Sequence, residues 1–565
     1  MMRLPNRGPA WVLWLAVALS SGCSASHYRT SADREVYKIL REGELKHLGK
    51  TNDFNIDTRY SKRAPDSIKS AEIIQERLLA EQRKVGLEEA LKIAVASNRQ
   101  YQFRKESLYL AALTLTKERY DFGPKFSASA TATGLRDSNG EKSGEIRSQI
   151  GVDKLLKGGG RVGIAIANDV LRYYTGNPRP TATSTLSVNL LQPLLRGAGA
   201  AIVAENLTQA ERNLVYEIRA YSHFQNTFAV EVVTTYYRLL QQKDTVRNTY
   251  SNYRNLLVAR ERAEALAIDR LPVFQVDQAR QDELRAKSSY LLSVEGYKIS
   301  LDRFKNTLGL PIGVEISLDD AALEDLTKAG LLPVQLTETD GYAMAVKSRL
   351  DLLNEIDRFE DSKRKIKVMA NALKADLNIF ADASLGSEGP TDYAKFDLTK
   401  YRAGAGVQLN LPLDRLRERN NYRASLVSFE RQIRSLSLTL DDARNDVRQG
   451  LRTLEQLRQN YQIQQNAVEL ADRRVEIAPL LLQAGRAQIR DQLEAQTAQF
   501  QARNALTQAL VDYHVARLGL LINIGKLETG EDHFWTRDQP SSKRGDVSAA
   551  PVEAEVIPPE KLFGK

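Results

Sequence analysis

Apolar residues recur every three to four positions in long stretches of this chain, and every second position in shorter stretches between them. Helical spacing begins at Leu87 and continues to about Tyr120, where Gly123-Pro124 ends it. The next residues alternate, so one face carries Phe126 and three alanines while the other carries serine and threonine hydroxyls. The pattern therefore predicts a helix that leads directly into a β-strand.

Two further alternating segments, 162–167 and 186–190, precede a much longer helical stretch. Helical spacing then extends over 200–265, and at a rise of about 1.5 Å per residue such a helix is about 90 Å long. Pro272 interrupts this stretch, and a second helical pattern returns to Leu308. The sequence thus predicts a long helical hairpin after the strands.

The same order of patterns recurs in the second half. Helical spacing over 343–376 is followed by alternation in 377–384 and 402–411. A coiled-coil seam over 426–447 and a returning helix that ends at Gly525 complete the series. Two copies of one helix–strand–helix unit are therefore expected.

Individual residues recur at a constant offset and support a tandem duplication. Tyr297 and Tyr513 are 513 − 297 = 216 positions apart, and Gly309 and Gly525 are 525 − 309 = 216 positions apart. Composition alone can make long helices look alike, but it does not produce a shared Tyr–Gly ending at one offset. We interpret the chain as a duplication.

The N-terminus has the composition of a secretory signal. Basic residues precede an uninterrupted apolar run at 11–19, which is shorter than the roughly 20 residues of a membrane-spanning helix. The small residues before Cys23 resemble a bacterial lipobox, although Ser20 stands where that pattern favours Leu. This resemblance implies a lipoprotein that is cleaved before Cys23 and acylated there, palmitate included, and Ser24 in place of Asp implies the outer membrane. The alternative is an ordinary signal peptide that is cut elsewhere.

Composition excludes several classes of function. Lys plus Arg total 80 and Asp plus Glu total 71, and the small net charge of +9 is dispersed without a basic patch for nucleic acid. A single cysteine excludes an intrachain disulfide, and the five histidines have no metal-ligand spacing. Phosphate-binding loops, nucleophile elbows and HExxH motifs are absent from the sequence. We expect neither an enzyme nor a bound metal or cofactor.

The alternating segments favour a membrane barrel. Hydroxyl and glycine positions on one face suit a lumen, and apolar positions on the other suit lipid. Open strand edges are not tolerated in lipid, and so few strands per chain cannot enclose a large pore, so several copies must share one barrel. The expected fold class is mainly α with a membrane β-barrel, in which tandem-repeat coiled-coil helices form an α-barrel and the strands join a shared trimeric β-barrel. A soluble sheet packed on helices explains the alternation equally well, but not the 90 Å helices.

Five short segments resemble the signatures of the TolC-like outer-membrane efflux family, in the family's order between about Leu87 and Gly525. They are Leu87–Leu91 leading to Ser97-Asn98, Gln192–Gly197, Ala345 with Arg349–Leu352, Val407–Leu413, and Gly485 with Asp491–Ala495. Leu350 departs from the usual Pro. The strand region 126–190 is also longer than 377–411, with room for extra strands or long loops.

The resemblance implies a homotrimer with a twelve-stranded barrel in the outer membrane and a twelve-helix tube in the periplasm. Family members are the passive exit ducts of tripartite drug or metal efflux pumps and of type I secretion systems. The implied partners are a periplasmic adaptor (membrane fusion) protein, a proton-driven or ABC inner-membrane pump, and outer-membrane lipid. The exported substrate and the choice between efflux and secretion do not follow from the sequence.

These patterns divide the chain into six segments. They are a signal peptide at 1–22, a lipid-anchored N-terminal extension at 23–84, a first repeat at 85–310, a connector at 311–340, a second repeat at 341–526 and a disordered C-terminal tail at 527–565. The extension is polar and poorly periodic, which is typical of a tether, and the tail is rich in Pro, Ser and charge.

Charged residues at the predicted hairpin tips are the candidates for a periplasmic gate. They are Asp269, Arg270, Arg486, Arg490 and Asp491. In a threefold assembly each becomes a ring of charge, and such rings select ions. Gly485 is a candidate adaptor-docking turn. The alternative is that these are ordinary solvated turn residues. For the chain as a whole, the alternative function is a non-transporting, lipid-anchored coiled-coil scaffold or adhesin of the envelope.

Overall fold

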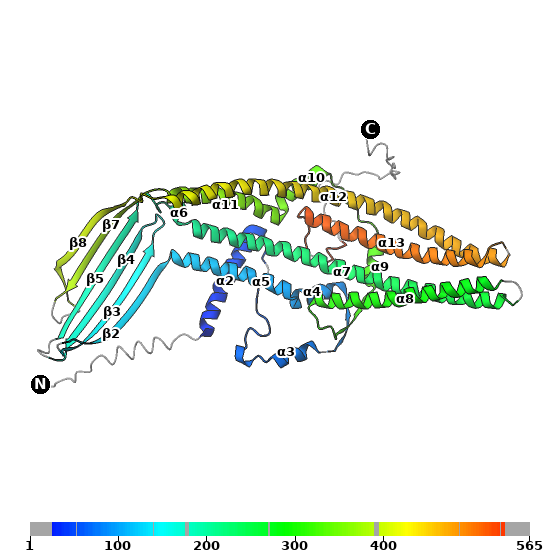
Figure 1. The fold of residues 1–565 in the computed structure, drawn as a ribbon, viewed down its shortest axis with the longest axis horizontal. Helices are drawn as coiled ribbons and strands as arrows, with labels where there is room; N and C mark the ends of the chain where they lie inside the picture. Colours follow the sequence, from blue (N-terminus) through cyan, green and yellow to red (C-terminus); the bar gives the residue numbers. More distant parts are fainter. Residues whose placement is uncertain are drawn as a thin grey trace.

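The computed structural model describes residues 25–51, 54–78, 80–138, 140–175, 180–268, 272–388, 395–484, 486–530 and 533–536. The molecule is elongated, with a sheet at one end and long helices that run from the sheet to the other end (Figure 1). The fold class predicted from the sequence, mainly helical with one membrane-type sheet, is confirmed for the single chain.

The sheet has six antiparallel strands in the order β2-β3-β4-β5-β7-β8. They are β2 (Pro124–Arg136), β3 (Lys142–Leu155), β4 (Arg161–Tyr173), β5 (Pro180–Pro193), β7 (Asp376–Ser387) and β8 (Phe396–Asn410). The sequence pattern identified all of these except β3. The extra length of the first strand region therefore forms strand rather than surface loop.

The helices follow the predicted duplication. The first repeat contains α4 (Leu87–Ser97), α5 (Arg99–Asp121), α6 (Ala200–Val203), α7 (Glu205–Leu266) and α8 (Val273–Leu308). The second contains α10 (Glu338–Ser348), α11 (Leu350–Ala372), α12 (Leu416–Gln483) and α13 (Ile489–Asn523). In each repeat a short and a medium helix precede the strands, and a long helical hairpin follows them. The 62 residues of α7 give a helix about 93 Å long.

Two glycines show that the repeats match in backbone geometry. Gly309 and Gly525 end α8 and α13 with left-handed φ values of 76° and 69°. A Cβ on Gly309 would overlap the carbonyl oxygen of Ser97, and a Cβ on Gly525 would overlap the backbone of Ser348. Each glycine thus lets the end of a long hairpin lie directly against the junction of the two helices that open the same repeat.

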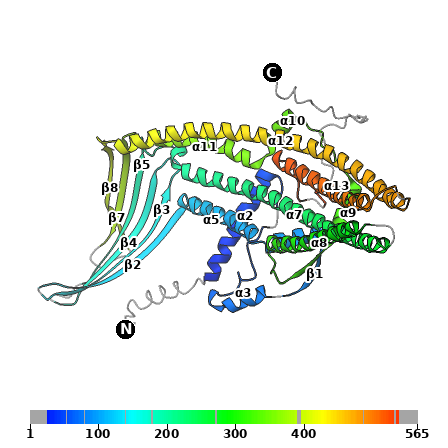
Figure 2. The same cartoon turned by 45° about the vertical axis from the view of Figure 1, so that its right-hand side comes forward.

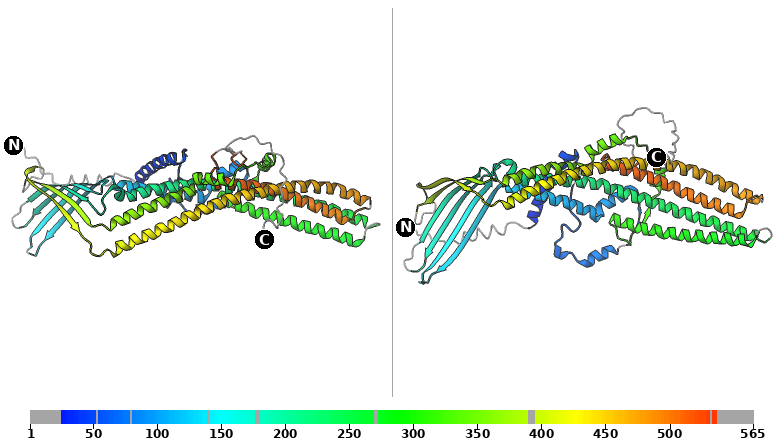
Figure 3. Two further views of the ribbon diagram at one scale, coloured as in Figure 1. Left: turned by 90° about the horizontal axis from the view of Figure 1, so that it is seen from above. Right: turned by 45° about the horizontal axis from the view of Figure 1, so that its top comes forward.

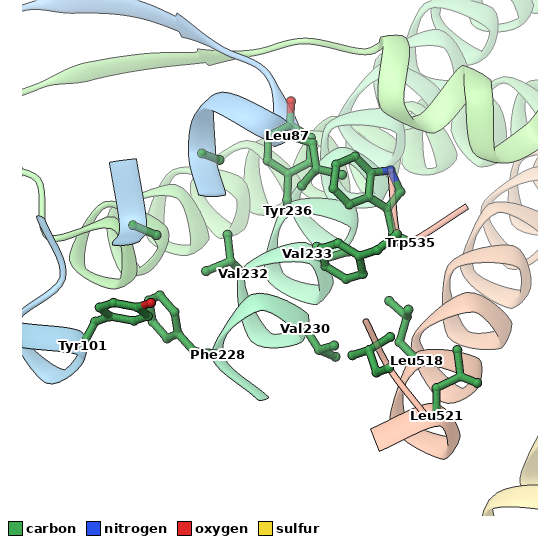
Figure 4. Close-up of a cluster of buried hydrophobic side chains, with 14 of the residues drawn as sticks. Leu87, Tyr101, Phe228, Val230, Val232, Val233, Tyr236, Leu518, Leu521 and Trp535 are labelled. Carbon is green, nitrogen blue, oxygen red and sulfur yellow. The ribbon is translucent and has the colours of Figure 1, made fainter. Parts of the chain in front are cut away.

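The main apolar core surrounds the middle of α7. Figure 4 shows Val232, Val233 and Tyr236 of α7 between Leu87 of α4 and Leu518 of α13. Two short parallel strands, β1 (Gln82–Val85) and β6 (Glu315–Leu318), lie beside this core. The Tyr236 hydroxyl lies 3.0 Å from the carbonyl oxygen of Val85, the last residue of β1. It also lies 3.1 Å from the carbonyl oxygen of Asp319, which directly follows β6. The core therefore joins the connector and the N-terminal extension to both repeats.

The N-terminal extension is not the featureless tether that its polarity indicated. It contains α2 (Ala25–Leu48), the short helix η1 (Pro65–Ser67) and α3 (Ser70–Arg77). The α2 helix packs against α5 and α7, and Val36 and Leu40 are fully buried (Figure 2). The Tyr109 hydroxyl donates to Asp33 Oδ1 at 2.7 Å. Three apolar residues at helical spacing, Val36, Ile39 and Leu40, are enough to dock α2 on the helical wall.

The beginning of the predicted disordered tail is also ordered. Leu527, Phe534 and Trp535 are buried, and Arg517 Nη1 donates to the carbonyl oxygen of Trp535 at 3.2 Å. The prediction treated all of 527–565 as disordered because the end of the chain is polar. It overlooked Phe534 and Trp535, whose large apolar surfaces favour burial. Residues 537–565 lie outside the described part of the chain.

Substitution of the two terminating glycines tests the repeat geometry. We expect Gly309→Ala and Gly525→Ala each to destabilise the protein by about 2 kcal/mol or more, because each combines a left-handed φ with backbone overlap. Gly296→Ala is the matched control, since a Cβ at this helical position meets nothing within 4 Å. The control should raise stability by roughly 0.5–1 kcal/mol. Melting temperatures of the three purified variants measure this difference; equal shifts would contradict the geometry.

Candidate functional site: channel wall and periplasmic mouth

The long helices form a wall four helices wide. Next to the sheet, neighbouring helices pack in the order α5, α7, α11 and α12, and toward the far end the order is α8, α7, α13 and α12 (Figure 3). The edge strand β2 follows α5 directly, and the other edge strand, β8, leads into α12. The same two sides of the chain are therefore edges in both the sheet and the helical wall.

The two faces of the sheet differ in polarity. Apolar side chains share one face across all six strands, as the cross-strand row Phe126, Val152, Ile164 and Val188 illustrates. This face also carries Ala128, Ala130, Ile146, Ile150, Ile166, Leu186, Leu190, Leu385, Tyr401, Val407 and Leu409. Many of its large apolar residues are exposed in the single chain; Phe126 is 77% exposed. Such a surface needs lipid or another apolar partner.

The opposite face carries charged, amide and hydroxyl groups, and a row that includes the apolar Leu155, Leu191 and Phe380. One row across five strands reads Asp153, Gly163, Asn189, Asp382 and Gly404. The glycines leave room for the carboxylates, since a Cβ on Gly163 would lie 2.7 Å from Asp153 Oδ1. A cavity of about 300 Å³ lies along this row. The polar face thus has the hydrogen-bonding groups of a water-filled lumen.

One polar row lies on the apolar face, and its groups pair with one another. Ser184 Oγ donates to Asn168 Oδ1 at 2.5 Å, and Asn168 Nδ2 lies 3.5 Å from Ser148 Oγ. The Ser184 backbone N–H donates to Ser387 Oγ at 2.8 Å. Because these bonds run between adjacent strands, the row is compatible with an apolar surrounding.

A buried carboxylate joins the two repeats within the helical wall. Asp361 of α11 accepts hydrogen bonds from the Tyr216 hydroxyl of α7 at 2.6 Å and from Arg364 Nη1 at 2.7 Å. Burial opposes the charged form, but the hydrogen bonds outweigh it, so the pKa of Asp361 is lowered. Burial and the adjacent carboxylate raise the pKa of Tyr216 to about 12. Asp361 therefore stays ionised and holds α11 against α7.

A second apolar cluster joins the two hairpins near their tips. It consists of Leu256, Ala259, Ala263, Ala279, Ala286, Ile489 and Leu493, from α7, α8 and α13. Ala279 is fully buried, and small residues at such positions let helices approach closely. The tips of the two hairpins in one chain are thus packed together.

Four of the predicted site residues lie outside the described residues: Cys23, Asp269, Arg270 and Gly485. Of the others, Asp491 is in the first turn of α13, where its Oδ2 accepts from the Gln488 backbone N–H at 2.9 Å. This carboxylate therefore stabilises the helix start, in addition to any role at the mouth. Arg486 lies in the short connection just before α13, and its backbone N–H donates to the carbonyl oxygen of Leu481.

Arg490 belongs to a charge cluster that the sequence interpretation only partly found. Its Nε lies 3.6 Å from Glu494 Oε1, and Glu494 Oε2 lies 3.5 Å from Arg474 Nη2 of α12. Arg490 and Glu494 are four residues apart and therefore lie on one face of the helix. This spacing in the sequence could have identified Glu494 as a partner of Arg490. Arg474 is brought in only by the packing of α12 against α13. The three side chains are about half exposed or more, so their attraction is weak in the single chain.

The sheet with one apolar and one polar face, continued by a helical wall, defines a membrane-channel fold. Residues 342–526 match the family described as "Outer membrane efflux protein", which covers the second repeat from α10 to the end of α13. The second repeat is therefore an outer membrane efflux protein domain, and the TolC-like resemblance stated from the sequence is confirmed. No match was found among curated proteins.

Solved outer-membrane channels have the same fold as the chain. The Campylobacter jejuni CmeC outer membrane channel matches with a TM-score of 0.56 at 14% identity, over 81% of this chain and 90% of CmeC. The outer membrane protein VceC from Vibrio cholerae matches with a TM-score of 0.54 at 15% identity, over 78% of this chain and 96% of VceC. The open-state MtrE outer membrane channel of Neisseria gonorrhoeae matches with a TM-score of 0.54 at 13% identity, over 78% of this chain and 89% of MtrE. The described helices include none long and apolar enough to cross a membrane.

A comparison of two variants tests whether Asp491 stabilises the start of α13 as a capping residue or only adds to the surface charge. We expect Asp491→Ala to weaken the first turn of α13 by about 1 kcal/mol, because a capping carboxylate at the positive end of the helix is lost. Hydrogen exchange of amides in 488–494 should accelerate several-fold. The control Arg490→Ala removes only an exposed ion pair and should change exchange little. Equal protection in both variants would contradict the assignment.

Proposed function

We propose that this chain is one subunit of a homotrimeric exit duct in the outer membrane. The observation that carries the proposal is the six-stranded sheet with two different faces, whose edge strands lie on the same sides as the edge helices. A head-to-tail contact that joins one edge to the other closes into a ring if its rotation allows. The apolar face then contacts lipid, and the polar face surrounds water.

The helical wall continues the duct into the periplasm, and its tips form the mouth. Asp269, Arg270, Arg486, Arg490 and Asp491 are the proposed mouth residues. Repeated around a threefold axis, they form rings of positive and negative charge. A docked partner or a bound ion can shift the balance between the open and closed mouth through these rings. The turn at Gly485 is the proposed docking point of a periplasmic adaptor. The adaptor connects the duct to a proton-driven or ABC inner-membrane pump, for efflux or type I secretion.

The N-terminal segment is the proposed second attachment to the membrane. Lipidation of Cys23 would place an acyl anchor two residues before α2 begins. Because α2 packs on α5 and α7, an anchored N-terminus would fix the helical wall at a set height below the membrane. Acyl chains add buried CH₂ groups at about 0.8 kcal/mol each.

Conductance tests the duct directly. In planar bilayers the purified full-length protein should give discrete single-channel steps, and native mass spectrometry should give a trimer, because three chains are needed to close one lumen. An edge variant with Ala130→Lys in β2 should lose the trimer and the conductance, since it places a charge on the apolar face. Ala165→Lys is the control on the polar face. A monomer without conductance under any condition would support a scaffold or adhesin instead.

Lipidation is tested by the mass of the mature chain. We expect the N-terminal fragment to begin at Cys23 and to carry acyl chains, palmitate among them, on its thiol and its amino group. Cys23→Ser should remove them and release the protein more readily from outer-membrane preparations, because the acyl anchor is lost. A mature N-terminus elsewhere with an unmodified thiol would contradict the anchor and leave the duct untouched.

A further inference from the structure

The two repeats differ by one β-hairpin. The helices α5 and α11, which lead into the strands, each have 23 residues. Pro193 lies 193 − 121 = 72 residues after the end of α5, and Pro412 lies 412 − 372 = 40 residues after the end of α11. The difference is 72 − 40 = 32 residues, the length of the hairpin β3–β4 from Lys142 to Tyr173. By position, β2 then corresponds to β7 and β5 to β8.

This hairpin changes the width of the sheet relative to the helical wall. Six strands spaced about 4.8 Å apart and tilted by about 40° span an arc of roughly 38 Å. Four packed helices spaced about 8–10 Å apart span roughly 32–40 Å. Without β3 and β4, four strands would span only about 25 Å. With the hairpin, each chain therefore contributes arcs of equal length to both parts of the wall.

The two edges of the sheet are suited to pair with another copy. The middle of β2, from Phe126 to Leu135, includes no charged side chain, and neither does the second half of β8, from Ala403 to Asn410, whereas the first half of β8 carries three charges. Edge strands that remain unpaired usually carry charges or proline that prevent pairing. The strands have 13 and 15 residues and the same alternation of apolar and polar positions. The occupant that fits the β8 edge is thus β2 of a second copy of this chain.

We propose that β3–β4 widens the duct to an eighteen-stranded barrel, in place of the twelve strands that the family resemblance implies. This rests on the proposed trimer. Eighteen strands at the same tilt give a backbone diameter of about 36 Å, against about 24 Å for twelve. The membrane section is then about as wide as the helical tube. The cargo class that this duct admits includes bulky polypeptide segments as well as small molecules.

The strand count of the unmodified full-length protein in lipid nanodiscs, determined by cryo-electron microscopy, tests the proposal. Eighteen strands in one closed ring, with β8 of each chain paired to β2 of the next, is the expected result. A conducting trimer with twelve barrel strands and β3–β4 outside the ring would overturn the inference and leave the proposed duct intact. Absence of both a ring and conductance would instead overturn the duct.

A deletion of residues 142–177 gives the matched comparison. It removes both strands of the hairpin, so the direction of the remaining strands still alternates. It also keeps the 137–141 connection and places Phe126 opposite Val188, two positions that already share one cross-strand row. We expect a twelve-stranded trimer whose membrane section is narrower by about one third. A deletion variant with an unchanged barrel diameter would overturn the role of the hairpin.

Discussion

Backbone pairing at the edges of the sheet is the constraint on which the proposed assembly depends. Inside a membrane an unpaired N–H or C=O group costs several kcal/mol, so the free edges of β2 and β8 cannot remain open there. One chain does not satisfy both edges, because β2 and β8 lie at opposite ends of its sheet and do not pair with each other. The same edges extend along the helical wall, where α5 and α8 lie on one side and α12 on the other. Closure of the sheet therefore requires closure of the wall.

The duplication explains how one chain can supply a uniform wall. Gly309 and Gly525 set the same backbone contact in both repeats, so both long hairpins leave the sheet in the same way. The repeats are held together by Asp361, which is buried and ionised between α7 and α11. An apolar pair at this point would hold the helices without fixing their register; directional bonds to Asp361 from Tyr216 and Gln209 of α7 specify one register.

Sequence periodicity predicted the long helices, the hairpins and the duplication, because each depends on many residues with one spacing. It missed β3, whose apolar face is interrupted by Ser148 and whose other face mixes Glu145, Arg147 and Gly151. Only pairing with β2 and β4 makes that segment a strand. It also missed the docking of α2, where a few apolar residues decide the outcome. At the mouth it identified charges, but not that Asp491 caps α13, because capping depends on where the helix begins.

The unequal repeats separate two requirements, the regular packing of the helical wall and the number of strands in the sheet. The helical wall needs equivalent units, since its packing repeats along the whole tube, and the helices of the two halves are accordingly matched in order. The sheet accepts any even number of added strands. An inserted hairpin adds two antiparallel strands and returns the chain to the end of the sheet from which it started. Although β3 and β4 separate β2 from β5 in the sheet, α5 and α7 still pack directly against each other. In the proposed barrel, an added hairpin therefore widens the sheet while the order of the packed helices stays the same in both repeats.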